Sequence, residues 1–123
     1  FVCNVSENQV GAVLHIPFGA WNASEHANAL RLMVAKEVID IARQKGIDID
    51  DDYAVKQLEQ LKKVPYANKP STLQDIEHGR KTEVEMFAGT VIRLGKETGV
   101  PTPLNEFLYH AVRVLEEKNE GII

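Results

Sequence analysis

Apolar side chains recur at helical spacing over most of the chain. The clearest stripe consists of Leu30, Met33, Val34, Val38 and Ile41. Its members repeat at intervals of three and four residues, which is the period of one helix face. Ser24 stands ahead of the stripe as a candidate N-cap, and Gly46 follows it where helices commonly end. The pattern predicts one long helix between Ser24 and Gly46.

Similar stripes predict further helices on both sides of this one. The expected buried positions are Val55, Leu58 and Leu61 before Pro65, then Val84, Phe87, Val91 and Leu94 before Gly99, and finally Leu104, Phe107, Leu108, Ala111, Val112 and Leu115. Thr102 followed by Pro103 is typical of a helix start. Residues 1–14 have a less regular helical spacing, which ends in the segment HIPFGAW.

The stretch KPSTLQDIEHGRKTEVE concentrates polar side chains around two helix breaks. Ser71 and Gln74 have the spacing of a capping box, so a short helix is expected to begin near Thr72. Gly79 weakens the far end of that helix, and Thr82 can cap the next one. Local helix chemistry therefore accounts for Ser71 without a functional site.

Length and composition fit one ordinary folded domain. The chain has 123 residues, of which 44% are hydrophobic and 26% charged. Strand-type alternation is not sustained anywhere, and internal repeats are absent. The sequence therefore predicts an all-α fold, a single helical domain of about six helices.

Charge and cysteine content narrow the functional classes. The formal net charge is −4, and the lysines and arginines form no basic block, so nucleic-acid binding is not expected. No apolar run approaches the roughly 18–20 residues of a membrane-spanning helix, so membrane association is not expected either. Cys3 is the single cysteine and cannot form a disulfide within the chain, which fits a cytoplasmic protein.

Motifs for phosphates and metals are missing from the chain. The glycines form neither the Gly-x-Gly-x-x-Gly pattern nor a Gly-Lys-Ser/Thr loop, so no nucleotide cradle is recognisable. The four histidines are far apart and lack the spacing of metal ligands. No metal site is expected.

Asn4 and Asn8 are the first candidates for a binding site. They stand four residues apart and therefore share a face if residues 1–14 are helical. Asparagine is a poor helix former, although spacing alone favours the interpretation that both side chains face water. Together with Ser71 and Glu83 they could hold a small hydroxylated anion, but none of these side chains is a strong acid or base.

The segment STLQDIEHGRKTEVEMFAGTVIRLGKETGVPTPLNEFLY is very similar to the C-terminal part of 2-dehydropantoate 2-reductases, also called ketopantoate reductases. Three phrases carry the resemblance: Ser-x-Leu-Gln-Asp-Ile, Gly-Arg-x-Thr-Glu-Val and Gly-Val-Pro-Thr-Pro-Leu-Asn. A weaker resemblance extends over residues 1–118. It implies a helical domain resembling the C-terminal domain of 6-phosphogluconate dehydrogenase.

The resemblance also implies the rest of an enzyme. Residues 1–123 would be its substrate-binding and dimerisation domain, and an N-terminal Rossmann domain, absent from this chain, would bind NADP. A small 2-oxo acid would be reduced in the cleft between the domains of a homodimer, while the isolated chain would be inactive. The matching residues are Asn4, Asn8, Asn68 and Ser71 for the substrate, and Glu83 for catalysis and the cofactor. The proton-donating lysine would stand immediately before Phe1.

Two positions depart from the family pattern. Many members have Asn-Pro where this chain has Asn8-Gln9, and a further asparagine where Phe18 stands. An apolar ring in place of an amide would change the polar contacts of the substrate. Three hypotheses therefore stay open: a 2-dehydropantoate reductase, a reductase of another 2-oxo acid, and a helical interaction module without catalysis.

Overall fold

The computed structural model describes residues 1–123, and every regular element is a helix. The elements are α1 (Val2–Leu14), α2 (Ala20–Ala23), α3 (Glu25–Gln44), α4 (Tyr53–Leu61), α5 (Ser71–Glu77), the π-helix η1 (Glu85–Gly89), α6 (Thr90–Thr98) and α7 (Pro103–Glu120). The predicted all-α class is confirmed. All six expected helices are present, and α2 is an additional short helix that begins inside the HIPFGAW segment.

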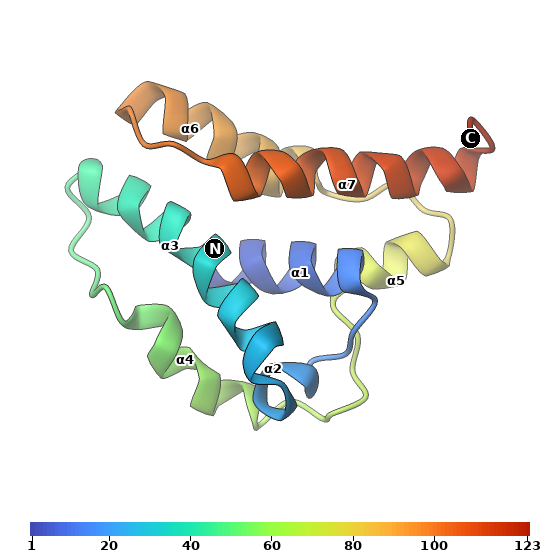
Figure 1. Ribbon diagram of the computed structural model, residues 1–123, viewed down its shortest axis with the longest axis horizontal. Coiled ribbons are helices and arrows are strands. Elements are labelled where there is room, and N and C mark those ends of the chain that lie inside the picture. The colour runs from blue at the N-terminus through green and yellow to red at the C-terminus, as the bar shows by residue number, and fades with distance from the viewer.

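Helix α1 is the central element. It packs against α3, α4, α5, α7 and η1, and Figure 1 shows it between α7 on one side and α2 and α4 on the other. Every residue from Val5 to Ala12 is buried. This buried stretch includes the successive polar residues Ser6, Glu7, Asn8 and Gln9, so α1 carries polar chemistry into the interior of the fold.

Two apolar clusters hold the other helices to α1. In the first, Trp21 is only 1% exposed and packs with Val10, Val34 and Leu108. In the second, Val5 packs with Val38, Ile41, Phe87 and Val91. Burying a large side chain of this kind contributes about 1.5–3 kcal/mol. The clusters therefore hold α1 against α3, α6 and α7. The positions of the polar side chains on α1 are fixed by this packing.

Four apolar side chains predicted to be buried are exposed: Leu30, Met33, Val55 and Phe107. The buried faces of α3 and α4 differ from the predicted apolar stripes. Arg31 and Ala35 are buried on α3, and Ala54 is buried on α4. Arg31 can lie inside because its guanidinium pairs with Glu7 and donates to the carbonyl oxygen of Ala54. Periodicity cannot anticipate such a partner.

Helix ends follow the sequence signals in part. The Ser24 hydroxyl accepts a hydrogen bond from the Ala27 N–H at 3.1 Å, and Gly99 has a φ of 77°, as predicted for a cap and a stop. The capping box is wrong, since the amide of Gln74 donates to the carbonyl oxygen of Lys69 and the Ser71 hydroxyl donates to Asn8. None of the helices combines the length and apolar character needed to span a bilayer.

Candidate active site

Helices α1 and α5 pack closely along one seam. A Cβ atom on Gly11 would lie 2.7 Å from Cγ of Pro70, so only glycine allows this approach without a shift of the chain. At the end of α1, Nε2 of His15 lies 3.2 Å from Oε2 of Glu77. These contacts set the register of the two helices and bring Asn8 opposite Ser71.

The seam brings together two of the predicted site residues. The Ser71 hydroxyl donates to Oδ1 of Asn8 at 2.8 Å, and the Thr72 N–H approaches the same oxygen at 3.4 Å. Nδ2 of Asn8 donates to the carbonyl oxygen of Asn4 at 2.9 Å. Asn8 is 8% exposed, so the interpretation that it faces water is wrong, whereas Asn4 is exposed. Asn8 thus links α1 to the start of α5.

Asn68 lies in the loop before α5, where main-chain bonds hold it. Its carbonyl oxygen accepts from the Phe18 N–H at 2.8 Å, and the carbonyl oxygen of Tyr66 accepts from the Gly19 N–H at 3.0 Å. The Asn68 side chain is exposed and makes no hydrogen bond within the chain. The ring of Phe18 is half-buried against the Trp21 cluster, which accounts for an apolar residue at this position.

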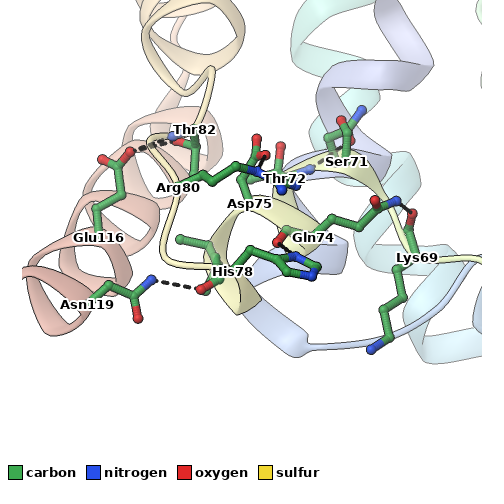
Figure 2. Close-up of polar contacts among 12 residues, drawn as sticks. Lys69, Ser71, Thr72, Gln74, Asp75, His78, Arg80, Thr82, Glu116 and Asn119 are labelled. Carbon is green, nitrogen blue, oxygen red and sulfur yellow. Dashed lines mark hydrogen bonds and ion pairs between the residues drawn. The ribbon is translucent and has the colours of Figure 1, made fainter.

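Glu83 is positioned by a buried contact of its neighbour. Oε2 of Glu116 on α7 accepts from the N–H and the hydroxyl of Thr82 at 2.8 and 3.0 Å, as Figure 2 shows. Arg113 donates to the other oxygen of Glu116 at 2.8 Å. The Glu83 side chain is exposed and forms neither a hydrogen bond nor an ion pair within the chain, so its carboxylate is available to a ligand.

The cations that flank Ser71 along the chain are already engaged. Nζ of Lys69 donates to both carboxylate oxygens of Glu77 at 2.9 Å, and Nε of Arg80 donates to Asp75 at 3.1 Å. The hydrogen bond from Lys69 lowers the pKa of Glu77, against a smaller opposing effect of burial. Beside Ser71 the chain therefore offers hydroxyl and amide groups, with its nearest lysine and arginine tied to carboxylates.

The family of known proteins described as "Ketopantoate reductase PanE/ApbA C terminal" matches residues 1–116. This chain belongs to that ketopantoate reductase family. The 2-dehydropantoate 2-reductase of Pyrococcus horikoshii is 31% identical over an alignment of 123 positions, which covers 98% of this chain and 40% of that protein. The chain spans about 40% of the length of the curated relatives it matches.

Solved structures agree with this membership in the ketopantoate reductase family. A PanE/ApbA family ketopantoate reductase from Ralstonia eutropha has a TM-score of 0.82 and 27% identity, and the match covers 97% of this chain and 40% of that one. A D-mandelate dehydrogenase in complex with NADH and anilino(oxo)acetate has a TM-score of 0.87 and 24% identity, covering 97% of this chain and 50% of that one. At that identity the second likeness shows the fold alone.

Two residues that shape the candidate site have no signal in the sequence. Gly11 sets the approach of α5, and Glu116 fixes the backbone before Glu83. Both act through partners that are distant along the chain, so no local pattern marks them. No group of three or more His, Cys, Asp or Glu side chains in residues 1–123 is arranged to hold a metal ion.

Proposed function

We propose that this chain is the substrate-binding and dimerisation domain of an NADPH-dependent 2-dehydropantoate 2-reductase. The complete enzyme would reduce ketopantoate to pantoate, a step toward pantothenate and coenzyme A. The observation that carries the proposal is that Asn8 and Ser71, 63 positions apart in the sequence, meet in a hydrogen bond beside the exposed side chain of Asn4. The proposed reaction is taken from the family to which the chain belongs.

In this proposal the residues of the chain bind and orient the substrate. Asn4, Asn68 and Ser71 present exposed polar groups to the polar parts of a 2-oxo acid. Asn8 holds Ser71 in place, and one N–H of its amide donates to the carbonyl oxygen of Asn4. The Glu83 carboxylate would hold the ammonium group of a lysine that precedes Phe1. That lysine would donate the proton to the developing alkoxide.

The residues of this chain could form only one side of a cofactor-binding site. Glu83 is the single candidate contact, because its exposed carboxylate can accept a hydrogen bond from an amide or a ribose hydroxyl. No glycine-rich turn is present to approach a pyrophosphate. When bound in the complete enzyme, NADPH supplies the hydride. We therefore expect residues 1–123 alone to be inactive.

In the complete protein, Asn4→Ala and Glu83→Ala are each expected to lower kcat for ketopantoate by about 10- to 1,000-fold. The fold should not change, because both side chains are exposed and neither makes a hydrogen bond within the chain. Steady-state kinetics and far-ultraviolet circular dichroism measure the two effects. Glu120→Ala is the matched control, since Glu120 is also an exposed acid without a partner. Wild-type kinetics in both site variants would refute the proposed site.

A reductase of another 2-oxo acid is the second candidate. Phe18 favours it, because the family pattern has an asparagine there and this chain places a half-buried ring. The D-mandelate dehydrogenase with the same fold is a protein named for a different acid. Assaying the complete protein with ketopantoate beside other branched and aromatic 2-oxo acids separates the candidates, because a higher kcat/KM for another acid would remove the pantothenate assignment.

The proposal includes a homodimer, and an apolar groove is the surface we assign to it. The groove encloses about 160 Å³ and has only hydrophobic side chains: Val10, Val13, Leu14, Leu30, Val34, Leu104, Phe107 and Leu108. Val13 is nine residues from Asn4 on α1, about two and a half helical turns, and so points to the opposite side. A domain that closes over Asn4 therefore leaves this groove open to a second copy of the chain.

Phe107→Glu is expected to convert the dimer of the complete protein to monomer, because Phe107 is 65% exposed at the groove and a charge there would lose its water on association. Sedimentation equilibrium over a range of concentrations measures the change. Val114→Glu is the control, since Val114 is exposed on the same helix but does not line the groove. An unchanged dimer in Phe107→Glu would place the interface elsewhere.

A further inference from the structure

Gln9 is a buried polar residue whose side-chain amide makes no hydrogen bond within the chain. It is 0% exposed, and neither its Oε1 nor its Nε2 has a partner among the protein atoms. A buried amide without hydrogen bonds is costly, so the polar groups in the interior of a protein are nearly always paired with protein or with ordered water. The Gln9 amide therefore requires a partner from outside the chain.

Helical periodicity places Gln9 beside η1 and α7. It lies four residues from both Val5 and Val13, so the three side chains share one face of α1. Val5 belongs to the apolar cluster that contains Phe87 of η1. Val13 packs against the cluster that contains Val112 of α7. The Gln9 side chain, between them, therefore lies at the junction of α1, η1 and α7.

The π-helix η1 brings a second buried polar group to this junction. The carbonyl oxygen of Glu83 accepts from the Phe87 N–H at 3.0 Å, four residues on. The carbonyl oxygen of Val84 accepts from the Gly89 N–H at 3.0 Å, five residues on. The two carbonyl groups within helical reach of the Ala88 N–H are thus engaged by its neighbours. Ala88 is completely buried, so its N–H also requires an acceptor in the interior.

Asn105 on α7 provides a third group, an acceptor. Its Nδ2 donates to Oε1 of Glu37 at 2.7 Å, which fixes the orientation of the amide, while its Oδ1 is buried without a partner. Asn105 lies one helical turn before Leu108 on α7. Leu108 shares an apolar cluster with Val10, the residue that follows Gln9. The unpaired oxygen therefore belongs to the same junction.

We propose that Gln9 binds ordered water inside the junction of α1, η1 and α7. A water molecule donates two hydrogen bonds and accepts two, and buried waters in proteins typically make about three. It can accept from the Ala88 N–H and donate to Oε1 of Gln9 and Oδ1 of Asn105, which no single protein side chain at the junction does. Two small buried side chains, those of Ala12 and Ala88, flank this position.

The bound water joins the two elements that carry candidate site residues. Gln9 directly follows Asn8 on α1, and η1 begins two residues after Glu83. The water thus provides a polar contact between elements that otherwise meet through apolar side chains. It is a property of the folded chain, and it holds whichever acid the complete protein reduces.

A high-resolution crystal structure of the complete wild-type protein tests the proposal directly. We expect density for a water molecule within hydrogen-bond distance of Oε1 of Gln9, the main-chain nitrogen of Ala88 and Oδ1 of Asn105. A direct hydrogen bond from the Gln9 amide to another protein group would overturn the proposal. A dry junction would overturn it as well.

Gln9→Met tests the same site in solution, because methionine keeps the length of the side chain and removes both polar atoms. Relaxation dispersion of oxygen-17 in water measures how many water molecules stay inside the complete protein, and this number should fall in Gln9→Met. Gln60→Met is the matched control, since it makes the same change at an exposed glutamine on α4 and should keep the wild-type number. Equal numbers in the wild type and in folded Gln9→Met would contradict the proposal, and the wild-type crystal structure decides it if Gln9→Met does not fold.

Discussion

Replacing Arg31 by alanine is expected to lower the free energy of unfolding by about 3–5 kcal/mol, because it leaves a buried carboxylate without its partner. Arg31 is 0% exposed, and its Nη1 lies 3.5 Å from Oε2 of Glu7. Its Nη2 donates to the carbonyl oxygen of Ala54 at 2.7 Å, and its Nε donates to Asn28 at 3.0 Å. One side chain thus joins α1, α3 and α4. Urea denaturation followed by circular dichroism measures the loss.

The pH dependence of this loss follows from Glu7. Burial raises the pKa of Glu7 from its ordinary value of 4.5 to about 7, although the nearby Arg31 guanidinium and the Phe1 amino group oppose the shift. The folded chain therefore binds a proton at Glu7 more tightly than the unfolded chain does. The resulting stabilisation is complete below about pH 4.5 and is lost as the pH rises through 7. Arg31→Ala should therefore cost more at pH 8 than at pH 5.

Two variants control this experiment. Glu7→Gln should remove the pH dependence that Glu7 gives to the free energy of unfolding. Between pH 4.5 and 7, the free energy of unfolding of the wild type should therefore fall by about 3 kcal/mol at most relative to that of Glu7→Gln. Lys36→Ala breaks an exposed ion pair with Asp40 on the same helix and should cost less than about 1 kcal/mol. A loss in Arg31→Ala no larger than in Lys36→Ala would contradict the role assigned to the buried pair.

The fold class and the helices could be predicted because their signals are local. Ser24 caps α3 through its own next turn, and Gly99 ends α6 in a backbone conformation that glycine adopts readily. Pro103 stands at the first position of α7, as its fixed φ favours. Such features need only a few neighbouring residues, and a sequence displays all of them.

The buried polar residues could not be predicted, because their partners are remote. Spacing alone favours water for Asn8, and the apolar stripes do not include Glu7 or Arg31, since a polar side chain is costly to bury alone. In the fold each of them has a partner on another helix, and Thr72 lies 64 positions from Asn8. Leu30 and Phe107 show the opposite error. They belong to the apolar stripes and were expected to be buried, but both are exposed in the fold.

The candidate site shows the same division. The resemblance named Asn8 and Ser71, but the capping-box spacing assigned the Ser71 hydroxyl to the start of its own helix. In the structure the start of α5 faces the amide of Asn8, and Ser71 donates to that amide instead. The local pattern thus identified the helix and misassigned the hydrogen bond on which the chemistry of Ser71 depends.

Glu37→Ala is expected to lower the free energy of unfolding by about 2–4 kcal/mol, because the start of α7 would lose its hydrogen-bond acceptor. The Glu37 carboxylate accepts from the N–H groups of Leu104 and Asn105 at 3.0 and 3.1 Å, and from the Asn105 amide at 2.7 Å. Glu37 and Asn105 are both buried, so water cannot replace these bonds. Urea denaturation of Glu37→Ala and Glu37→Gln measures the loss, which should be smaller in Glu37→Gln because one acceptor oxygen remains.

Thr102→Val is the control that separates this contact from the cap predicted by the sequence. Thr102 occupies the N-cap position of α7, yet its side chain makes no capping hydrogen bond. Valine keeps its branched shape, including the methyl group that packs on Gly95, so Thr102→Val should cost less than about 1 kcal/mol. If Thr102→Val were as costly as Glu37→Ala, the threonine would be the true cap. A larger loss in Glu37→Ala than in Thr102→Val would show that a side chain of α3 stabilises the start of α7. This contact couples the two longest helices of the fold.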